Sequence, residues 1–159
     1  MATINVSAGN EAVLVLADSA ANANFTANAG LVVPSMQDIT INNSTGVFRW
    51  KTLDSTAENA ATTPATNQLS LNVVVDTAAF FGTGTAGDDD VKEKGLFSVS
   101  KEKTKVYFRA YFNGTDSTSK FLSGVGYISG LAPTVNPDAP LWVTPVTIEV
   151  DGDYTVGTV

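Results

Sequence analysis

The sequence contains no cysteine and no histidine among its 159 residues. Without cysteine there is no disulfide framework, no thiol nucleophile and no zinc–thiolate site. Without histidine, the commonest general base and the commonest transition-metal ligand are both missing. A nucleophile–base pair would need serine with lysine, and no spacing points to such a pair. We therefore expect neither catalysis nor a cofactor.

Charge is also scarce. Charged residues make up 16% of the chain, against roughly 25% in a typical protein. The nine lysines and arginines are outnumbered by 16 acidic residues, which gives a net charge of −7. Nucleic acid is held by clustered basic side chains, so this chain should repel DNA rather than bind it. No stretch approaches the roughly 20 apolar residues of a membrane helix, and no membrane partner is expected.

The sequence does contain runs in which apolar residues alternate with other residues, and the clearest run lies just beyond the middle of the chain. Val106, Phe108, Ala110 and Phe112 alternate with charged or aromatic residues, which is typical of a strand with two different faces. A polar turn beginning at Asn113 follows. The next run, residues 120–131, is also strand-like, and its three glycines predict a bulge or a close approach by another backbone. Together the two runs predict a long hairpin.

Other strands are expected on both sides of this hairpin. Residues 36–50 predict an early hairpin, with a turn at residues 42–46. Residues 51–68 show no periodicity, and we interpret them as a long structureless loop, which in a compact domain is usually functional or disordered. Further strand-like runs lie at residues 2–7, 11–17, 31–33, 69–76 and 146–150, and we expect residues 154–156 to pair back after the Asp151-Gly152 turn.

Helical signals are few. Asp88, Asp89 and Asp90 precede VKEKGLF, and aspartate is a preferred N-cap residue. We expect one short helix of about two turns over residues 89–93, and the sequence leaves open a continuation beyond Gly95. A proline-spaced extended connection should span residues 132–140. The sum is a mainly β protein: a single-domain antiparallel β-sandwich or barrel with one short flanking α-helix and a long hairpin loop.

Three other kinds of site were weighed against structural roles. Asp88, Asp89 and Asp90 offer oxygen ligands for calcium, as does Asp151 with Asp153, but helix capping and a turn explain these residues more simply. A glycosidase needs two placed carboxylates, and no spacing selects a pair. The aromatic residues that might form a sugar-binding platform are explained as well by core packing or an interface; they are Trp50, Tyr107, Tyr111, Tyr127 and Trp142.

Several stretches together resemble the major tail tube proteins of long-tailed bacteriophages. They are MQDITINNSTGVFRW with the polar loop after it, DDDVKEKGLF leading into a strand, the hairpin TKVYFRAYFNGTDSTSKFLSGVGYISGL, and the closing PVTIEVDGDYTVG. The resemblance covers nearly the whole chain. It implies a single tail-tube domain over residues 1–159, with no extra immunoglobulin-like domain after it.

The resemblance also implies a function. Six copies would form a ring by continuing their sheets around a channel, and stacked rings would form a tube through which double-stranded DNA is ejected without specific binding. Partners would be other copies of the chain, a tape-measure protein, tail-tip or terminator proteins and, in a contractile tail, a sheath. The location would be the virion tail, assembled in the host cytoplasm.

Two sets of residues are candidates for these roles. The loop after the first hairpin would reach a neighbouring subunit or ring, with Lys51, Leu53, Asp54, Glu58 and Pro64 as its candidate contacts. Acidic residues at solvent-side strand positions would line the channel and repel phosphate, with Asp38, Glu149 and Asp151 as candidates. The alternative is a monomeric β-sandwich that binds carbohydrate or acts as an adhesin module.

Overall fold

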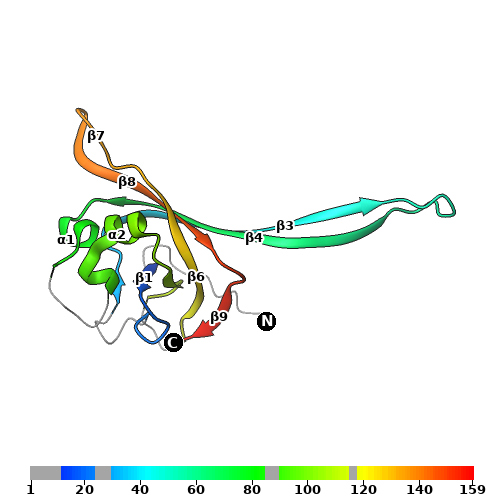
Figure 1. The fold of residues 1–159 in the computed structure, drawn as a ribbon, viewed down its shortest axis with the longest axis horizontal. Coiled ribbons are helices and arrows are strands. Elements are labelled where there is room, and N and C mark those ends of the chain that lie inside the picture. The colour runs from blue at the N-terminus through cyan, green and yellow to red at the C-terminus, as the bar shows by residue number, and fades with distance from the viewer. Residues whose placement is uncertain (1–11, 24–29, 85–89, 115–117) are drawn as a thin grey trace, which may run out of the picture.

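The chain folds around one curled antiparallel sheet with two helices against it (Figure 1). The computed structural model describes residues 12–23, 30–84, 90–114 and 118–159. The expected strand at residues 2–7 lies outside this part of the chain. The elements are β1 (Val13–Ala17), β2 (Leu31–Val32), β3 (Met36–Trp50), β4 (Asn59–Val74), α1 (Thr77–Phe81), α2 (Asp90–Glu102), β5 (Val106–Tyr111), β6 (Lys120–Leu131), β7 (Thr134–Asn136), β8 (Ala139–Val150) and β9 (Thr155–Thr158).

The sheet runs in the order β2-β1-β5-β6-β8-β4-β3, with β7 paired to β8 and β9 paired to β6. It curls so that one face encloses the core, and α2 packs against β6 and β1. Alternating residues of the strands supply the core: Leu14, Leu16, Leu69, Leu71, Val73, Val106, Phe108, Val146 and Ile148 are buried. Val91, Leu96 and Val99 of α2 complete it. The predicted mainly β, antiparallel architecture is confirmed.

The central hairpin is confirmed as well. β5 and β6 pair antiparallel from Val106–Gly126 to Tyr111–Phe121. Val106, Phe108 and Ala110 are buried on one face, as their alternation predicts. Phe112 departs from the pattern, because it lies beyond the end of β5 and is 40% exposed.

The glycines of β6 allow the close approach that the sequence predicts. A Cβ atom on Gly124 would lie 2.8 Å from the Phe108 ring, and one on Gly126 would lie 2.4 Å from the backbone oxygen of Glu149. The β6–β8 register also shifts between Ile128 and Gly130, as expected of a bulge. These contacts let β8 lie tightly against β6 while Phe108 fills the space beside it.

The helical prediction was incomplete. The described residues form two helices, and α1 gave no recognised signal, although Asp76 caps it by accepting a hydrogen bond from the Ala79 amide at 3.0 Å. α2 extends to Glu102 through a kink at Gly95, whose φ is +78°. A Cβ there would lie 2.2 Å from the Gly82 nitrogen, so glycine is required where the helices meet. Asp88 and Asp89 lie outside the described residues, so capping or calcium binding there is untested.

Two expected connections also differ. The proline-spaced segment is not a simple extended connection, because it contains β7, which pairs with the start of β8 as a hairpin. The last strand, β9, pairs with Lys120–Ser123 of β6 rather than folding back on β8. The reason is that the Asp151-Gly152 turn directs the chain toward β6, where Asp151 donates its amide hydrogen to the Val125 carbonyl at 2.7 Å.

Replacing Gly126 tests the β6–β8 contact. Gly126→Ala should reduce the free energy of unfolding by about 1–3 kcal/mol, because the added methyl group meets backbone that cannot rotate away. Gly130→Ala is the matched control, since its Cβ would find its nearest neighbours at 3.8 Å. Denaturant unfolding measures both, and equal stability of the two variants would contradict the tight contact.

Candidate assembly surfaces

The longest feature of the molecule is a two-stranded arm, residues 43–66, which extends away from the body (Figure 1). β3 and β4 pair along their whole length, from Met36–Val73 to Trp50–Asn59. β8 pairs with β4 only over Gln68–Val74. Within the described part of the chain, the arm therefore has only its own two strands, and all its residues except Ser55 are exposed.

The arm corrects two predictions. Residues 42–46 are not a turn but the middle of β3, and the supposed structureless loop at residues 51–68 is mostly β4. Only residues 51–58 connect the strands. The error has a physical cause: both faces of this ribbon are exposed, so neither strand needs the apolar alternation that marks a half-buried strand. Of the candidate loop residues, Lys51, Leu53, Asp54 and Glu58 lie at the tip, whereas Pro64 lies within β4.

A bulge halfway along the arm explains where glycine and proline occur. The register jumps between the pairs Thr45–Ala65 and Val47–Thr62, so Thr63 and Pro64 face the single residue Gly46. A Cβ on Gly46 would lie 2.3 Å from the Thr63 hydroxyl oxygen. Pro64 has no backbone amide hydrogen, so its place in the bulge leaves no hydrogen-bond donor without a partner. Proline on an open strand edge also prevents unwanted pairing with other chains.

Apolar residues are exposed on the outer half of the arm. The rings of Phe48 and Trp50 stack with their centroids 5.8 Å apart on one face of β3, and they are 60% and 41% exposed. Val47 lies on the other face, and Leu53 is fully exposed at the tip. Polar contacts at the tip are slight: Arg49 and Glu58 approach to 3.8 Å, and a hydrogen bond from the Thr52 side chain lowers the pKa of Asp54.

The base of the arm is fastened to the body by residues after β8. The Tyr154 hydroxyl lies 2.8 Å from the Asn42 carbonyl oxygen and 3.0 Å from that of Gln68, one on each strand. Burial raises the pKa of Tyr154, so the phenol keeps the proton that it donates. Asn67 is buried and donates its amide hydrogen to the Gly152 carbonyl at 2.7 Å. The arm therefore leaves the body in a fixed direction.

Two of the three acidic candidates share the outer, polar face of the sheet. Asp38 pairs with Asn72, and Glu149 pairs with Gln68, on the face opposite the buried Leu69 and Leu71. Asn72 donates its side-chain amide to both oxygens of Asp38, at 3.1 and 2.9 Å, and Gln68 donates to Glu149 at 2.8 Å.

The third candidate, Asp151, lies in the turn after β8. Lys105 donates to its carboxylate at 2.9 Å, and this bond raises the pKa of Lys105. The charge of Asp151 is thus already paired, in contrast to those of Asp38 and Glu149, which have amide partners.

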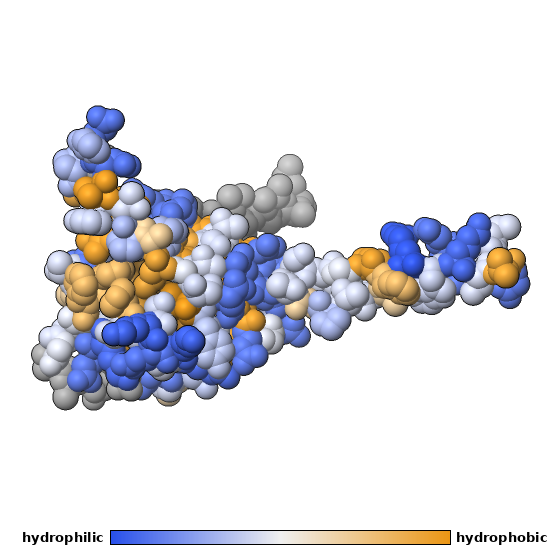
Figure 2. Space-filling model, turned by 45° about the horizontal axis from the view of Figure 1, so that its top comes forward, coloured by the Kyte–Doolittle hydropathy of each residue, from blue (hydrophilic) through white to orange (hydrophobic). Residues whose placement is uncertain are grey.

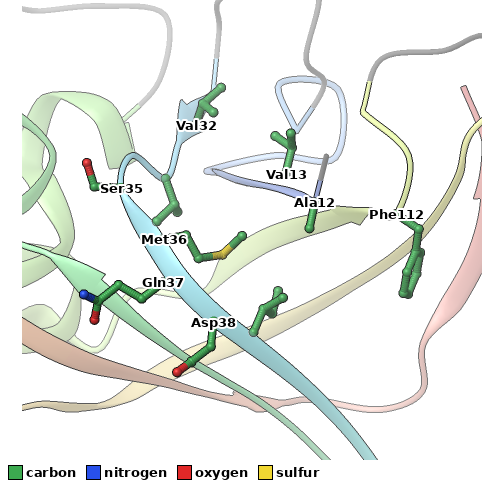
Figure 3. Close-up of a pocket in the computed structure, with 10 residues that line it drawn as sticks. Ala12, Val13, Val32, Ser35, Met36, Gln37, Asp38 and Phe112 are labelled. Atoms are coloured by element: carbon green, nitrogen blue, oxygen red, sulfur yellow. The ribbon is translucent and has the colours of Figure 1, made fainter. Parts of the chain in front are cut away.

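A groove of about 750 Å³ lies where the sheet fails to close, between β1–β2 and the start of β3 (Figure 3). Its labelled side chains are mainly apolar, and Met36 points across the gap toward Ala12 and Val13. Asp38 is the acidic residue of its lining, and that side chain is bonded to Asn72. The lining therefore offers no acid–base pair.

Exposed aromatic residues also lie at the end of the body that holds the helices. Phe81 of α1 and Phe97 of α2 both pack against the buried Phe80, with centroids 4.9 and 5.8 Å away, and remain 61% and 46% exposed. Trp142 of β8 is 54% exposed, and its carbonyl oxygen accepts a hydrogen bond from Val75, just before α1. We call Phe81, Phe97 and Trp142 the helix-end patch. Sequence reasoning missed it, although the Phe80-Phe81 pair was a visible signal.

The sugar platform considered above is not formed. Trp50 lies in the arm, Trp142 lies beside the helices at the other end of the molecule, and Tyr111 is buried. Among the described residues, no three or more acidic residues gather as a possible metal site. Nor is any helix in that part of the chain long and apolar enough to cross a membrane.

Comparison with solved structures gives this architecture a context. The chain superposes on the tail of an empty gene transfer agent particle, determined with C6 symmetry, with a TM-score of 0.67 at 10% identity, covering 96% of this chain and all of the other. A chain from the native gene transfer agent virion gives 0.65 at 9% identity, over 96% of this chain and all of the other. The SPP1 tail tube gives 0.64 at 10% identity, over 97% of this chain and 80% of the other.

The chain has the tail tube fold. The resemblance seen in the sequence is thereby confirmed at the level of the fold, since the superpositions span nearly the whole chain. No family model and no curated protein sequence matches the chain.

Removing the Tyr154 hydroxyl tests how the arm is held. Tyr154→Phe should reduce the free energy of unfolding by about 0.5–1.5 kcal/mol, because one carbonyl at the arm base loses its donor while the ring stays in place. Tyr127→Phe, on the outer face of β6, is the control and should have an effect within about 0.5 kcal/mol. Identical denaturant midpoints for the two variants would contradict the assigned anchor.

Proposed function

We propose that this chain is a structural protein of a virion tail, which assembles with copies of itself into stacked six-membered rings that form the tail tube. The observation that carries the proposal is the arm. A two-stranded ribbon is marginally stable alone in water, and this one also exposes Phe48, Trp50 and Leu53. The tail tube fold, shared with chains of assembled tails, supplies the context. Each copy would contribute one domain and no enzymatic activity.

Contact with another copy would complete the arm. Residues at its tip, Lys51, Leu53, Asp54 and Glu58, would reach a neighbouring subunit or ring, and Pro64 would shape the strand that leads there. Among the described strands, the edges of β2 and β3 are the other incomplete surfaces, since the sheet ends at these two strands. A monomer must protect such edges, whereas a polymer can pair them.

The outer sheet face would line the channel. Asp38 and Glu149 both lie on this face, and their charges would repel the phosphates of double-stranded DNA so that it passes without adhering. Asp151 would contribute less, because Lys105 neutralises it. A reconstruction of the assembled protein tests this assignment. We expect both carboxylates to line an open channel, and a channel lined by the helices would contradict it.

Further partners follow from the proposed place in the virion. A tape-measure protein would occupy the tube before DNA enters it, tail-tip and terminator proteins would close its ends, and a sheath would surround it in a contractile tail. The chain would be assembled in the host cytoplasm and then reside in the virion tail.

Shortening the arm tests the proposal. Residues 46–64 would be replaced by Asn-Gly, which joins the paired residues Thr45 and Ala65 through a favoured hairpin turn. The variant should keep its circular dichroism and unfolding transition, because the core residues remain, but it should form no tubes in negative-stain microscopy. A substitution on the outer sheet face, Ser70→Ala, is the control and should assemble normally. Normal tubes from the shortened chain would refute the role of the arm.

A further inference from the structure

We propose that the arm of one copy docks through Phe48 and Trp50 on the helix-end patch of a second copy, so that Phe81, Phe97 and Trp142 form the receiving surface. This inference rests on the proposed tube function and names the partner surface of the arm. It commits to a head-to-tail contact between identical chains.

The arm supplies one half of the contact. Phe48 and Trp50 are stacked on each other, so their rings already form one rigid aromatic surface. Aromatic side chains bury large areas at little entropic cost when they are held in this way. Tyr154 and Asn67 fix the base of the arm, which limits the directions in which these rings can be presented.

The helix-end patch supplies the other half. Phe80 is buried and holds Phe81 and Phe97 on either side, so these two exposed rings are also preorganised. Trp142 alternates along β8 in step with the buried Thr144 and Val146, and its carbonyl oxygen accepts a hydrogen bond from Val75, which directly precedes the cap of α1. Both surfaces are thus aromatic and rigid before they meet.

The position of the two surfaces selects the partner. They lie at opposite ends of the molecule, as the ribbon and the hydropathy surface both show, so the arm cannot reach the patch of its own chain (Figures 1 and 2). An arm-to-arm contact would close into pairs and leave the patch exposed. A head-to-tail contact covers both surfaces at once and repeats from copy to copy, so it extends the assembly around a ring or along a stack of rings.

Mixing two defective variants tests this contact. The arm variant carries Phe48→Ser and Trp50→Ser, and the patch variant carries Phe81→Ser and Phe97→Ser. All four side chains are exposed, so both variants should fold, and Trp142→Ser is a second patch variant if helix packing suffers. Tyr127→Ser, an exposed aromatic residue on the outer sheet face, is the control. Each defective variant alone should need at least about tenfold more protein to polymerise, the factor equivalent to 1.4 kcal/mol per contact.

The mixture gives the decisive result. Each defective variant retains one intact half of the contact, so the arm of the patch variant can dock on the patch of the arm variant. An affinity-tagged arm variant should therefore retain the patch variant as a complex of two chains that does not polymerise further. Polymerisation of the patch variant alone at the normal concentration would overturn the inference, as would a failure of the two variants to copurify.

Cross-linking separates the inference from the proposed function. Because the chain has no cysteine, Leu53→Cys at the arm tip and Lys101→Cys, one turn after Phe97, can be placed in separate copies and joined by a short bismaleimide. We expect cross-linked pairs to form, and we expect the double substitution Phe48→Ser with Trp50→Ser to abolish them. If the wild-type protein forms tubes but the two cysteine variants give no cross-link, the docking site is overturned and the tube proposal stands. Cross-linked pairs without tubes would retain the docking site and contradict the tube.

Discussion

The pairing of β4 holds the molecule together, because this strand runs from the arm into the body and there lies between two other strands. Over Gln68–Val74 it lies between β3 and β8 and buries Leu69, Leu71 and Val73 in the core. From Asn67 back to its start at Asn59, the one described strand that pairs with it is β3. The same backbone therefore passes from a packed sheet, whose stability comes from apolar burial, into a ribbon with no burial of its own. Tyr154 and Asn67 mark the point of transition, and every assembly surface that we propose is placed relative to it.

Sequence reasoning was accurate for the packed body and inaccurate for the arm. Strands with one buried face, such as β5 and the end of β4, were predicted because their apolar residues alternate. The glycines of β6 correctly indicated close backbone contact, and the overall antiparallel architecture was evident. The arm was misread as a turn followed by a loop, because Asn42 to Gly46 and Thr62 to Gln68 carry polar and small residues on both faces. A ribbon that is exposed on both faces carries no apolar alternation, so no periodic signal marks its strands.

The site candidates show the same limit. Asp38 and Glu149 were named from solvent-side strand positions, and the structure places them on one face of the sheet. Alternation along each strand is enough to predict which face a residue lies on. Asp151 lies instead in a turn with Lys105, a pairing between residues 46 positions apart that no local pattern reveals. The helix-end patch was missed because Phe81 and Phe97 look like core residues in sequence, and only the packing of Phe80 beneath them shows that they remain exposed.

The central claim is that the arm exists to be completed by another copy of the chain. Negative-stain microscopy of the purified wild-type protein, across a range of concentrations, tests it most directly. The account predicts tubes of uniform width with a central channel, appearing above a threshold concentration. Single copies at every concentration would contradict it.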